Sequence, residues 1–154
     1  MALSFSAVVL VVAVVTGGLL AGVFFVCACA VVPGFRRLDN RTFVAAFRAI
    51  NRAILNAWFL PVFFAAPVAA VLAAVVTGRP LAAAGAVCAV LTFAVTVGAN
   101  VPLNTALERA EVATDAGCRT ARERFERPWG RWNLVRTVTA VAALALLALL
   151  ALAA

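Results

Sequence analysis

Residues 132–154, WNLVRTVTAVAALALLALLALAA, decide the fold. A membrane-crossing helix needs about 20 apolar residues, and this stretch is long enough, with Arg136 as its single charged residue. Three further apolar runs resemble it, at about 3–33, 54–76 and 81–101. The chain is 66% hydrophobic, more than a soluble domain of 154 residues could bury. We predict one membrane domain, 1–154, an all-α transmembrane four-helix bundle with up-down-up-down topology.

The first run is interpreted as a retained helix, because it lacks the positive start and the short apolar region of a signal peptide. Gly18 and Gly22 lie four residues apart and give this helix a small-residue face. Such faces let helices approach closely, so we expect helix–helix association, a homo-oligomer included. Gly78-Arg79-Pro80 predicts a tight turn between the second and third helices.

Charged residues give the orientation. All 13 basic residues are arginines; Arg79 lies in the short turn, and the two long loops hold most of the others: Arg36, Arg37, Arg41, Arg48, Arg52, Arg109, Arg119, Arg122, Arg124, Arg127 and Arg131. Cytoplasmic loops carry such an excess, so we expect cytoplasmic long loops and both termini outside. The bias toward Arg, Ala, Val and Leu indicates a GC-rich coding sequence, and hence a bacterial inner membrane.

Both long loops are predicted to be helical. Phe43, Phe47 and Ile54 belong to an apolar stripe with three- and four-residue steps over 40–54, and Asn40 is its candidate cap. Residues 103–127 mix acidic and basic side chains, which predicts a solvated helical hairpin or cap with a break near Gly117.

The polar residues of the apolar runs gather on one side of the predicted membrane. They lie at the start of the second helix, the end of the third and the start of the fourth: Asn51, Arg52, Asn56, Asn100, Asn104, Trp132, Asn133 and Arg136. Polar groups at membrane depth are costly and usually functional. Each residue alone is better explained as an interfacial anchor or an interhelical hydrogen-bonding group. The set, from three helices, predicts one site.

These side chains suit a planar, partly anionic aromatic molecule. Tryptophan rings would stack on it, and arginine and asparagine donors would hold its oxyanion. The catalytic candidates are Arg136, Asn133, Asn104 and Glu108. The substrate-binding candidates are Asn51, Asn56, Asn100, Trp129 and Trp132.

Neither a metal nor a cofactor is expected. The chain has no His, and its four cysteines, Cys27, Cys29, Cys88 and Cys118, lack the spacing of a zinc site, so we interpret them as packing residues. We expect no nucleic-acid partner, because arginines that orient the spans and contact anionic lipids explain the net charge of +7. The expected partners are the lipid bilayer and a hydrophobic aromatic small molecule.

Three segments resemble the anthrone oxygenase-like family of small membrane proteins: FRAINRAILN at 47–56, NVPLN at 100–104 and WGRWNLVRT at 129–137. The resemblance implies a four-helix membrane protein. Fungal members oxidise anthrones to anthraquinones with O2, without a metal or an organic cofactor. The chain departs from the family pattern at Leu134, where a His is frequent, and at Thr105, where an acidic residue is frequent.

Our leading hypothesis is therefore an O2-dependent oxidation of a phenolic or anthrone-type aromatic, in which Arg136, Asn133 and Asn104 stabilise an enolate and Glu108 or Asp39 takes the proton. The alternative is a non-catalytic membrane protein that binds a lipid, a quinone or a partner protein. A small-molecule transporter is disfavoured, because proton-coupled pumps need a carboxylate inside the membrane and every Asp and Glu here lies in or beside a loop.

Overall fold

The computed structural model of the protein describes residues 4–153, which contain helices and no strand. Four helical columns are long and apolar enough to cross a membrane: Phe5–Phe35, Phe59–Thr77, Pro80–Arg109 and Asp115–Leu152. The first contains α1 (Phe5–Val26), the π-helical segment η1 (Cys27–Val31) and α2 (Val32–Phe35). The second is α4 (Phe59–Thr77), and the third contains α5 (Pro80–Val95), the π-helical segment η2 (Thr96–Asn100) and α6 (Val101–Arg109). The fourth is α7 (Asp115–Leu152), and α3 (Asn40–Ala53) is a separate, shorter helix.

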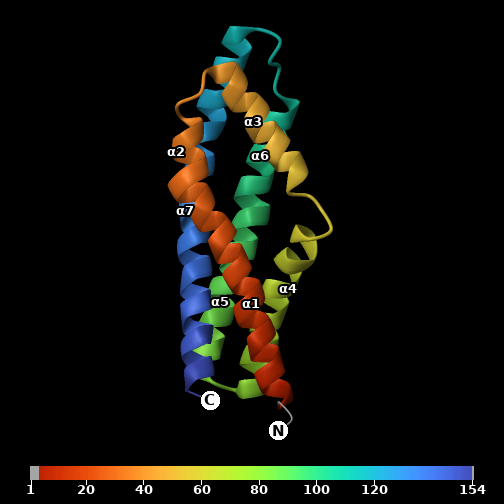
Figure 1. The fold of residues 1–154 in the computed structure, drawn as a ribbon, viewed down its shortest axis with the longest axis vertical. Helices are drawn as coiled ribbons and strands as arrows, with labels where there is room; N and C mark the ends of the chain where they lie inside the picture. The colour runs from red at the N-terminus through yellow and green to blue at the C-terminus, as the bar shows by residue number, and fades with distance from the viewer. Residues whose placement is uncertain (1–3, 154) are drawn as a thin grey trace.

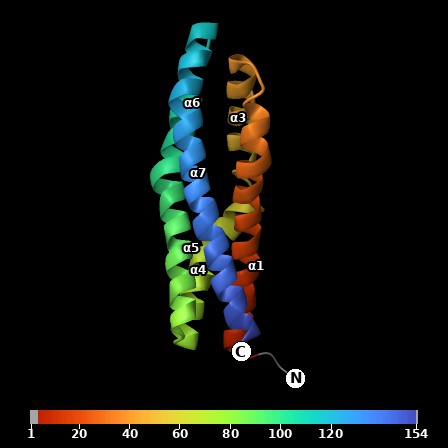
Figure 2. The ribbon, with the colours of Figure 1, turned by 90° about the vertical axis from the view of Figure 1, so that its left-hand side faces the viewer.

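Successive columns run in opposite directions, so the predicted all-α bundle is confirmed (Figure 1). The start of α1, the end of α7 and the α4–α5 turn lie at one end of the bundle, here called the inner end. The opposite, outer end carries α3 and the α6–α7 turn. In the outer half, α6 and α7 form one pair and α2 and α3 another, side by side (Figure 2).

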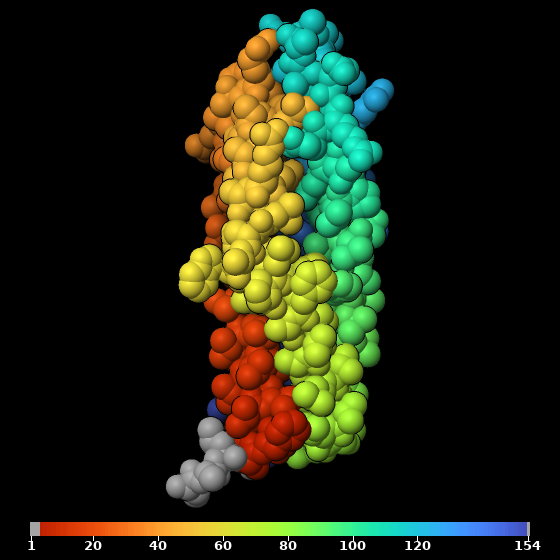
Figure 3. All heavy atoms as spheres, turned by 90° about the vertical axis from the view of Figure 1, so that its right-hand side faces the viewer, coloured from red at the N-terminus to blue at the C-terminus, as the bar shows by residue number. Residues whose placement is uncertain are grey.

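The helix bounds differ most from the predicted spans at the outer ends of the second, third and fourth columns. α4 begins at Phe59, because residues 54–58 form a bend, coloured yellow in Figure 3, that separates it from α3. α6 and α7 extend beyond the predicted spans into the outer half and meet at a turn over residues 110–114. The break expected near Gly117 is therefore misplaced: Thr114 caps α7 by accepting a hydrogen bond from the Gly117 amide at 3.1 Å.

The stripe predicted over 40–54 is confirmed at Phe43, Val44 and Phe47, which are buried, but not at its end, since Ile50 is 37% exposed and Ile54 follows the last residue of α3. Its cap is Asp39 rather than Asn40: the Asp39 carboxylate accepts from the Thr42 amide at 3.0 Å. Asn40 already belongs to the helix. Asp and Asn are both good N-cap residues, and the spacing of the apolar stripe is compatible with a cap at either position.

The inner and outer halves have different cores. The inner core is built from small and aliphatic side chains of α1, α4, α5 and α7, Ala13, Ala70, Ala73, Ala82 and Leu147 among them. On the surface of this inner half, apolar side chains such as Val68 and Val75 are exposed, as expected for helices that face lipid. The outer core is aromatic, with Phe43, Phe47, Phe125 and Trp129 packed together.

Each π-helical segment ends two residues before a proline, Pro33 after η1 and Pro102 after η2. Proline has no N–H and crowds the carbonyl four residues earlier, and a widened turn relieves that conflict. The Val32 and Val101 amides accordingly bond to the carbonyls of Cys27 and Thr96, five residues back. π-Helical turns often occur at functional sites, and η1 and η2 both adjoin the polar residues described next.

Candidate functional site

Arg136 lies on α7 with only 7% of its surface exposed. Its Nε and Nη2 atoms donate to the Asn133 side-chain oxygen at 3.1 and 2.9 Å. The guanidinium carbon lies 4.3 Å from the Phe24 ring centroid and 5.1 Å from the Trp129 ring centroid. Within residues 4–153, no carboxylate forms an ion pair with Arg136, and its Nη1 atom has no hydrogen-bond partner. A permanent cation is thus buried between two aromatic faces with a neutral amide as its partner.

Asn133 fixes this arrangement to the first column. It is 1% exposed, and its amide nitrogen donates to the Phe24 backbone carbonyl at 3.2 Å. Phe24 lies just before η1, where the regular hydrogen-bond ladder of the helix changes. Since the Asn133 nitrogen is held by α1, its oxygen is left to face Arg136.

Two asparagines of the third column hold Trp129. The Asn104 oxygen accepts from the Trp129 indole nitrogen at 2.7 Å, and the Asn100 nitrogen donates to the Trp129 carbonyl at 3.4 Å. Asn100 is 0% exposed, yet its side-chain oxygen has no partner in the described chain. A buried polar atom without a partner costs about 1–3 kcal/mol, so this oxygen is an acceptor available to a ligand.

Asn51, on α3, lies at about the same depth along the bundle as Asn133. Phe47 packs on Trp129 with ring centroids 5.3 Å apart, and α3 and α7 run in the same direction. Asn51 is one turn beyond Phe47 on the same helix face, as Asn133 is one turn beyond Trp129. The Asn51 amide nitrogen is buried and has no partner among the described residues. It is therefore an available donor near the level of Asn133.

Five of the predicted site residues lie together: Asn100, Asn104, Trp129, Asn133 and Arg136. This cluster, with Phe24, is called the Arg136 cluster below. It joins α1, the third column and α7, and it offers one free acceptor, one free guanidinium nitrogen and aromatic walls.

The remaining predicted residues have other positions. Asn56 is exposed in the bend before α4, where its oxygen accepts from the Trp58 and Phe59 amides at 2.9 Å each. Trp132 is 43% exposed on the surface of α7. Glu108 lies one turn beyond Asn104 on α6 and forms an ion pair with Arg52. None of the three has a hydrogen bond or an ion pair to the Arg136 cluster.

A model of the anthrone oxygenase family matches residues 47–146. The chain belongs to this family. The family match and the four long apolar helices together indicate an integral membrane protein. No curated protein and no solved structure matches the chain.

The match runs from the middle of α3 through most of α7 and contains every residue of the Arg136 cluster except Phe24. Phe24 escaped the sequence analysis, because nothing distinguishes it from other apolar residues of the first column. Its role depends on one backbone carbonyl and one ring face, and neither leaves a signal in the amino-acid pattern.

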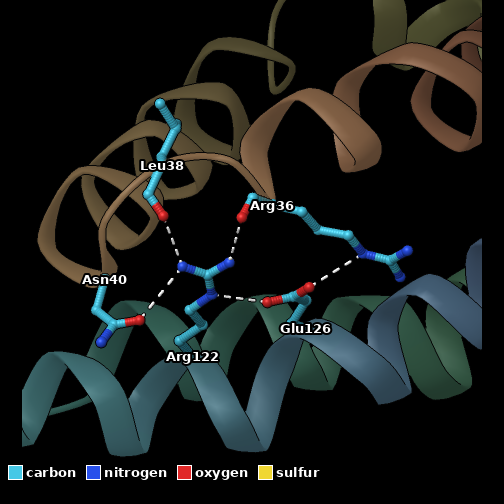
Figure 4. Close-up of polar contacts among 5 residues, drawn as sticks. All are labelled: Arg36, Leu38, Asn40, Arg122 and Glu126. Carbon is cyan, nitrogen blue, oxygen red and sulfur yellow. Dashed lines mark hydrogen bonds and ion pairs between the residues drawn. The ribbon is translucent and has the colours of Figure 1, made fainter.

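The role of Arg122 was also not predicted from the sequence. Arg122 donates to the Leu38 carbonyl at 2.8 Å, the Arg36 carbonyl at 3.0 Å and the Asn40 side-chain oxygen at 3.2 Å (Figure 4). It also pairs with Glu126 at 2.7 Å, and Glu126 in turn accepts from Arg36 at 3.1 Å. Arg122 thereby fastens the loop between α2 and α3 to α7.

The two carboxylates considered as bases are both engaged elsewhere. The Asp39 carboxylate accepts from the Thr42 hydroxyl at 2.6 Å as well as from its amide. These hydrogen bonds stabilise the ionised form and hold the pKa of Asp39 below its usual value.

Within the described chain, no group of three His, Cys, Asp or Glu side chains could hold a metal ion.

Proposed function

We propose that this protein oxidises a phenolic or anthrone-type aromatic with O2 at the Arg136 cluster, without a cofactor. The observation that carries the proposal is the buried Arg136, whose hydrogen-bond partner is a neutral amide. An uncompensated cation at membrane depth is costly unless it binds something of opposite charge. An anionic enolate is the species that this reaction class would place there.

The cluster matches the groups of a hydroxyanthrone. Its enolate oxygen would accept from Arg136, whose guanidinium lies against the Phe24 and Trp129 rings. A neighbouring phenol would donate to the free Asn100 oxygen. Because Arg136 stabilises the anion, it lowers the pKa of the substrate and favours loss of its proton.

The enolate then gives electrons to O2 at the carbon opposite the carbonyl. One oxygen atom becomes the second carbonyl of the quinone and the other leaves as water, so the anthrone and O2 yield the anthraquinone and water. The chain's own contribution is to stabilise the anion, hold the ring plane and exclude solvent.

Glu108 is the proposed proton acceptor, since it shares α6 with Asn104 and lies one turn away. Its carboxylate forms an ion pair with Arg52, and 38% of the Glu108 side chain is exposed. Glu108→Gln should slow oxygen uptake, because a glutamine side chain cannot accept the proton. Unchanged oxygen uptake in this variant would remove Glu108 from the mechanism.

We further propose that the arginine-rich end of the bundle, which carries α3 and the α6–α7 turn, faces the cytoplasm of a bacterial cell. Both termini would then lie on the opposite side of the bacterial inner membrane. The excess of arginine at the outer end, against Arg79 in the α4–α5 turn, supports this orientation. Cysteine-labelling of Arg79→Cys and Arg127→Cys from either side of the membrane tests it. Labelling of position 79 from the cytoplasm would reverse the orientation.

Oxygen consumption by the purified protein in lipid nanodiscs tests the proposed activity, with hydroxyanthrones and hydroquinones as substrates. The expected result is uptake above the spontaneous rate that Arg136→Gln abolishes. Arg131→Gln, an exposed neighbour on α7, removes the same charge and should leave uptake unchanged. Binding without uptake would favour a non-catalytic ligand-binding protein instead.

A further inference from the structure

A groove of about 570 Å³ lies between α6 and α7 in the outer half, apart from the Arg136 cluster. Leu103, Leu107 and Phe125 contribute its large apolar side chains. Small residues of both helices, Ala106, Ala110, Ala116, Gly117 and Ala121, leave the space between them open. This volume is within the usual range of about 300–1,000 Å³ for small-molecule sites.

Charged side chains also line this groove. They are Arg109 and Glu111 from the end of α6 and the turn after it, and Arg124 from α7. In residues 4–153, neither arginine takes part in an ion pair or a side-chain hydrogen bond. Five other outer-end arginines are paired with carboxylates, namely Arg36, Arg41, Arg52, Arg119 and Arg122, whereas Arg37, Arg48, Arg127 and Arg131 form no ion pair among the described residues. The groove therefore has an apolar floor, two unused guanidinium groups and one carboxylate, that of Glu111, which also forms no ion pair in the described chain, so the charge of its lining is net positive.

The groove lies outside the predicted membrane span. Arg124 is eight residues before Trp132 on the continuous helix α7, which places it about 12 Å further out at 1.5 Å per residue. Apolar surface in this position faces water or the headgroup layer rather than lipid tails, so a ligand that covers it gains hydrophobic free energy. Two cations beside that surface favour a ligand that is both apolar and anionic.

The groove adjoins the Arg136 cluster through two aromatic rings. Phe125 lines the groove and packs against Trp129, with ring centroids 5.8 Å apart. Trp129 in turn contacts Arg136 at 5.1 Å. Leu103, also in the groove, precedes the Asn104 that binds the Trp129 indole. The contact between Phe125 and Trp129 thus lies between a ligand in the groove and the Arg136 cluster.

We propose that the α6–α7 groove is a second binding site, which takes a planar aromatic anion from the aqueous side before it reaches the Arg136 cluster. The ligand class rests on the proposed function, whereas the site itself rests on the groove and its two unpaired arginines. The space between the two helices is lined by small residues and is large enough for fused rings, and Arg109 and Arg124 bind the anionic substituent.

The test is equilibrium binding of anthraquinone-2-sulfonate to the full-length protein in phosphatidylcholine nanodiscs, beside the neutral 2-(hydroxymethyl)anthraquinone. We expect the double variant Arg109→Gln/Arg124→Gln to bind the sulfonate about fivefold to tenfold more weakly and the neutral compound unchanged. Arg127→Gln, a matched charge removal on α7 outside the groove, should bind both as the unmodified protein does.

Ala106→Phe provides a second variant, because it fills the groove from an exposed position without changing a charge. It should weaken the binding of both compounds. Equal affinity of the double variant and Arg127→Gln for the sulfonate would overturn the proposal. Displacement of the sulfonate by phosphatidylglycerol in the nanodiscs would assign the groove to a lipid headgroup and also overturn it.

Arg136→Gln separates this proposal from the proposed function. Sulfonate binding that survives Arg136→Gln and fails in the double variant supports the groove, whatever the oxygen-uptake assay shows. Sulfonate binding that fails in Arg136→Gln and survives in the double variant places the ligand at the Arg136 cluster and refutes the groove.

Discussion

Arg122 and Arg136 lie on the same helix, about four turns apart, and differ in what surrounds them. Arg122, in the outer half, has the Glu126 carboxylate, two backbone carbonyls and the Asn40 oxygen as acceptors. Arg136, nearer the inner half, has the Asn133 oxygen and two aromatic faces. Both are largely buried, with 16% of the Arg122 side chain and 7% of Arg136 exposed.

The difference separates a structural arginine from a binding one. A buried cation with a full set of acceptors stabilises the segments that supply them, here the loop between α2 and α3. A buried cation with one neutral acceptor lowers stability, since its desolvation is not compensated. Arg136 is therefore best explained by a ligand that completes its partners, and the variants below test that distinction.

The largest effect is expected at Arg136. Arg136→Gln should lower substrate-dependent oxygen uptake by about 100-fold or more, because removal of one oxyanion-stabilising donor typically has this effect. Thermal stability should be unchanged or higher, since a poorly compensated charge is lost. Uptake rates and a melting curve on the same preparation test both parts. A large fall in stability with normal activity per folded molecule would make Arg136 structural, like Arg122.

Arg122→Gln should give the opposite pattern. We expect a loss of about 2 kcal/mol in unfolding free energy, because Glu126 and two backbone carbonyls lose their donor. Hydrogen exchange should become faster in residues 36–40, and oxygen uptake per folded molecule should not change. Arg119→Gln, whose partner Glu123 is exposed, is the matched control and should cost well under 1 kcal/mol. Equal effects of the two substitutions would contradict the structural role of Arg122.

Gly117→Ala should destabilise the outer half by about 1.5 kcal/mol. A Cβ atom at this position would lie 2.5 Å from the Glu111 carbonyl oxygen, so the α6–α7 turn would have to move. Gly130→Ala on the same helix meets nothing within 4 Å and should be neutral or slightly stabilising. Denaturant titration of both variants measures the difference. A Gly117→Ala protein as stable as Gly130→Ala would show that this turn is not closely packed.

The smallest effect concerns pH. Hydrogen bonds from Thr42 lower the pKa of Asp39 in the folded protein, so its capping of α3 is fully present above the ordinary aspartate pKa of 3.8. That stabilisation is lost as the pH falls through the lower, folded pKa. Exchange of the Thr42 amide should become faster below this pH, while amides near Arg136 stay protected. Asp39→Asn should remove the pH dependence, and a dependence that persists would assign it to another carboxylate.

Parts of the site could be predicted from the sequence. Asn100 and Asn104 share a helix face at four-residue spacing, and Asn133 and Arg136 do so at three, so their convergence followed from helix geometry and topology. Asn56 and Trp132 resemble the cluster asparagines and Trp129 in residue type and predicted depth, yet Asn56 accepts from the amides in the bend before α4 and Trp132 is exposed on α7. Residue type and depth do not fix which way a side chain faces across a bend.

The sequence by itself determined the four apolar helices, their alternation and the concentration of arginine at one end. Each of these features depends on whether a local run of side chains is more stable in lipid or in water, and not on distant parts of the chain. Only the tertiary structure decided which arginine is satisfied and which is not. That distinction depends on backbone carbonyls of distant segments, those of Arg36 and Leu38 for Arg122 and that of Phe24 for the partner of Arg136. Backbone groups are the same in every residue, so the sequence carries no record of where folding brings them.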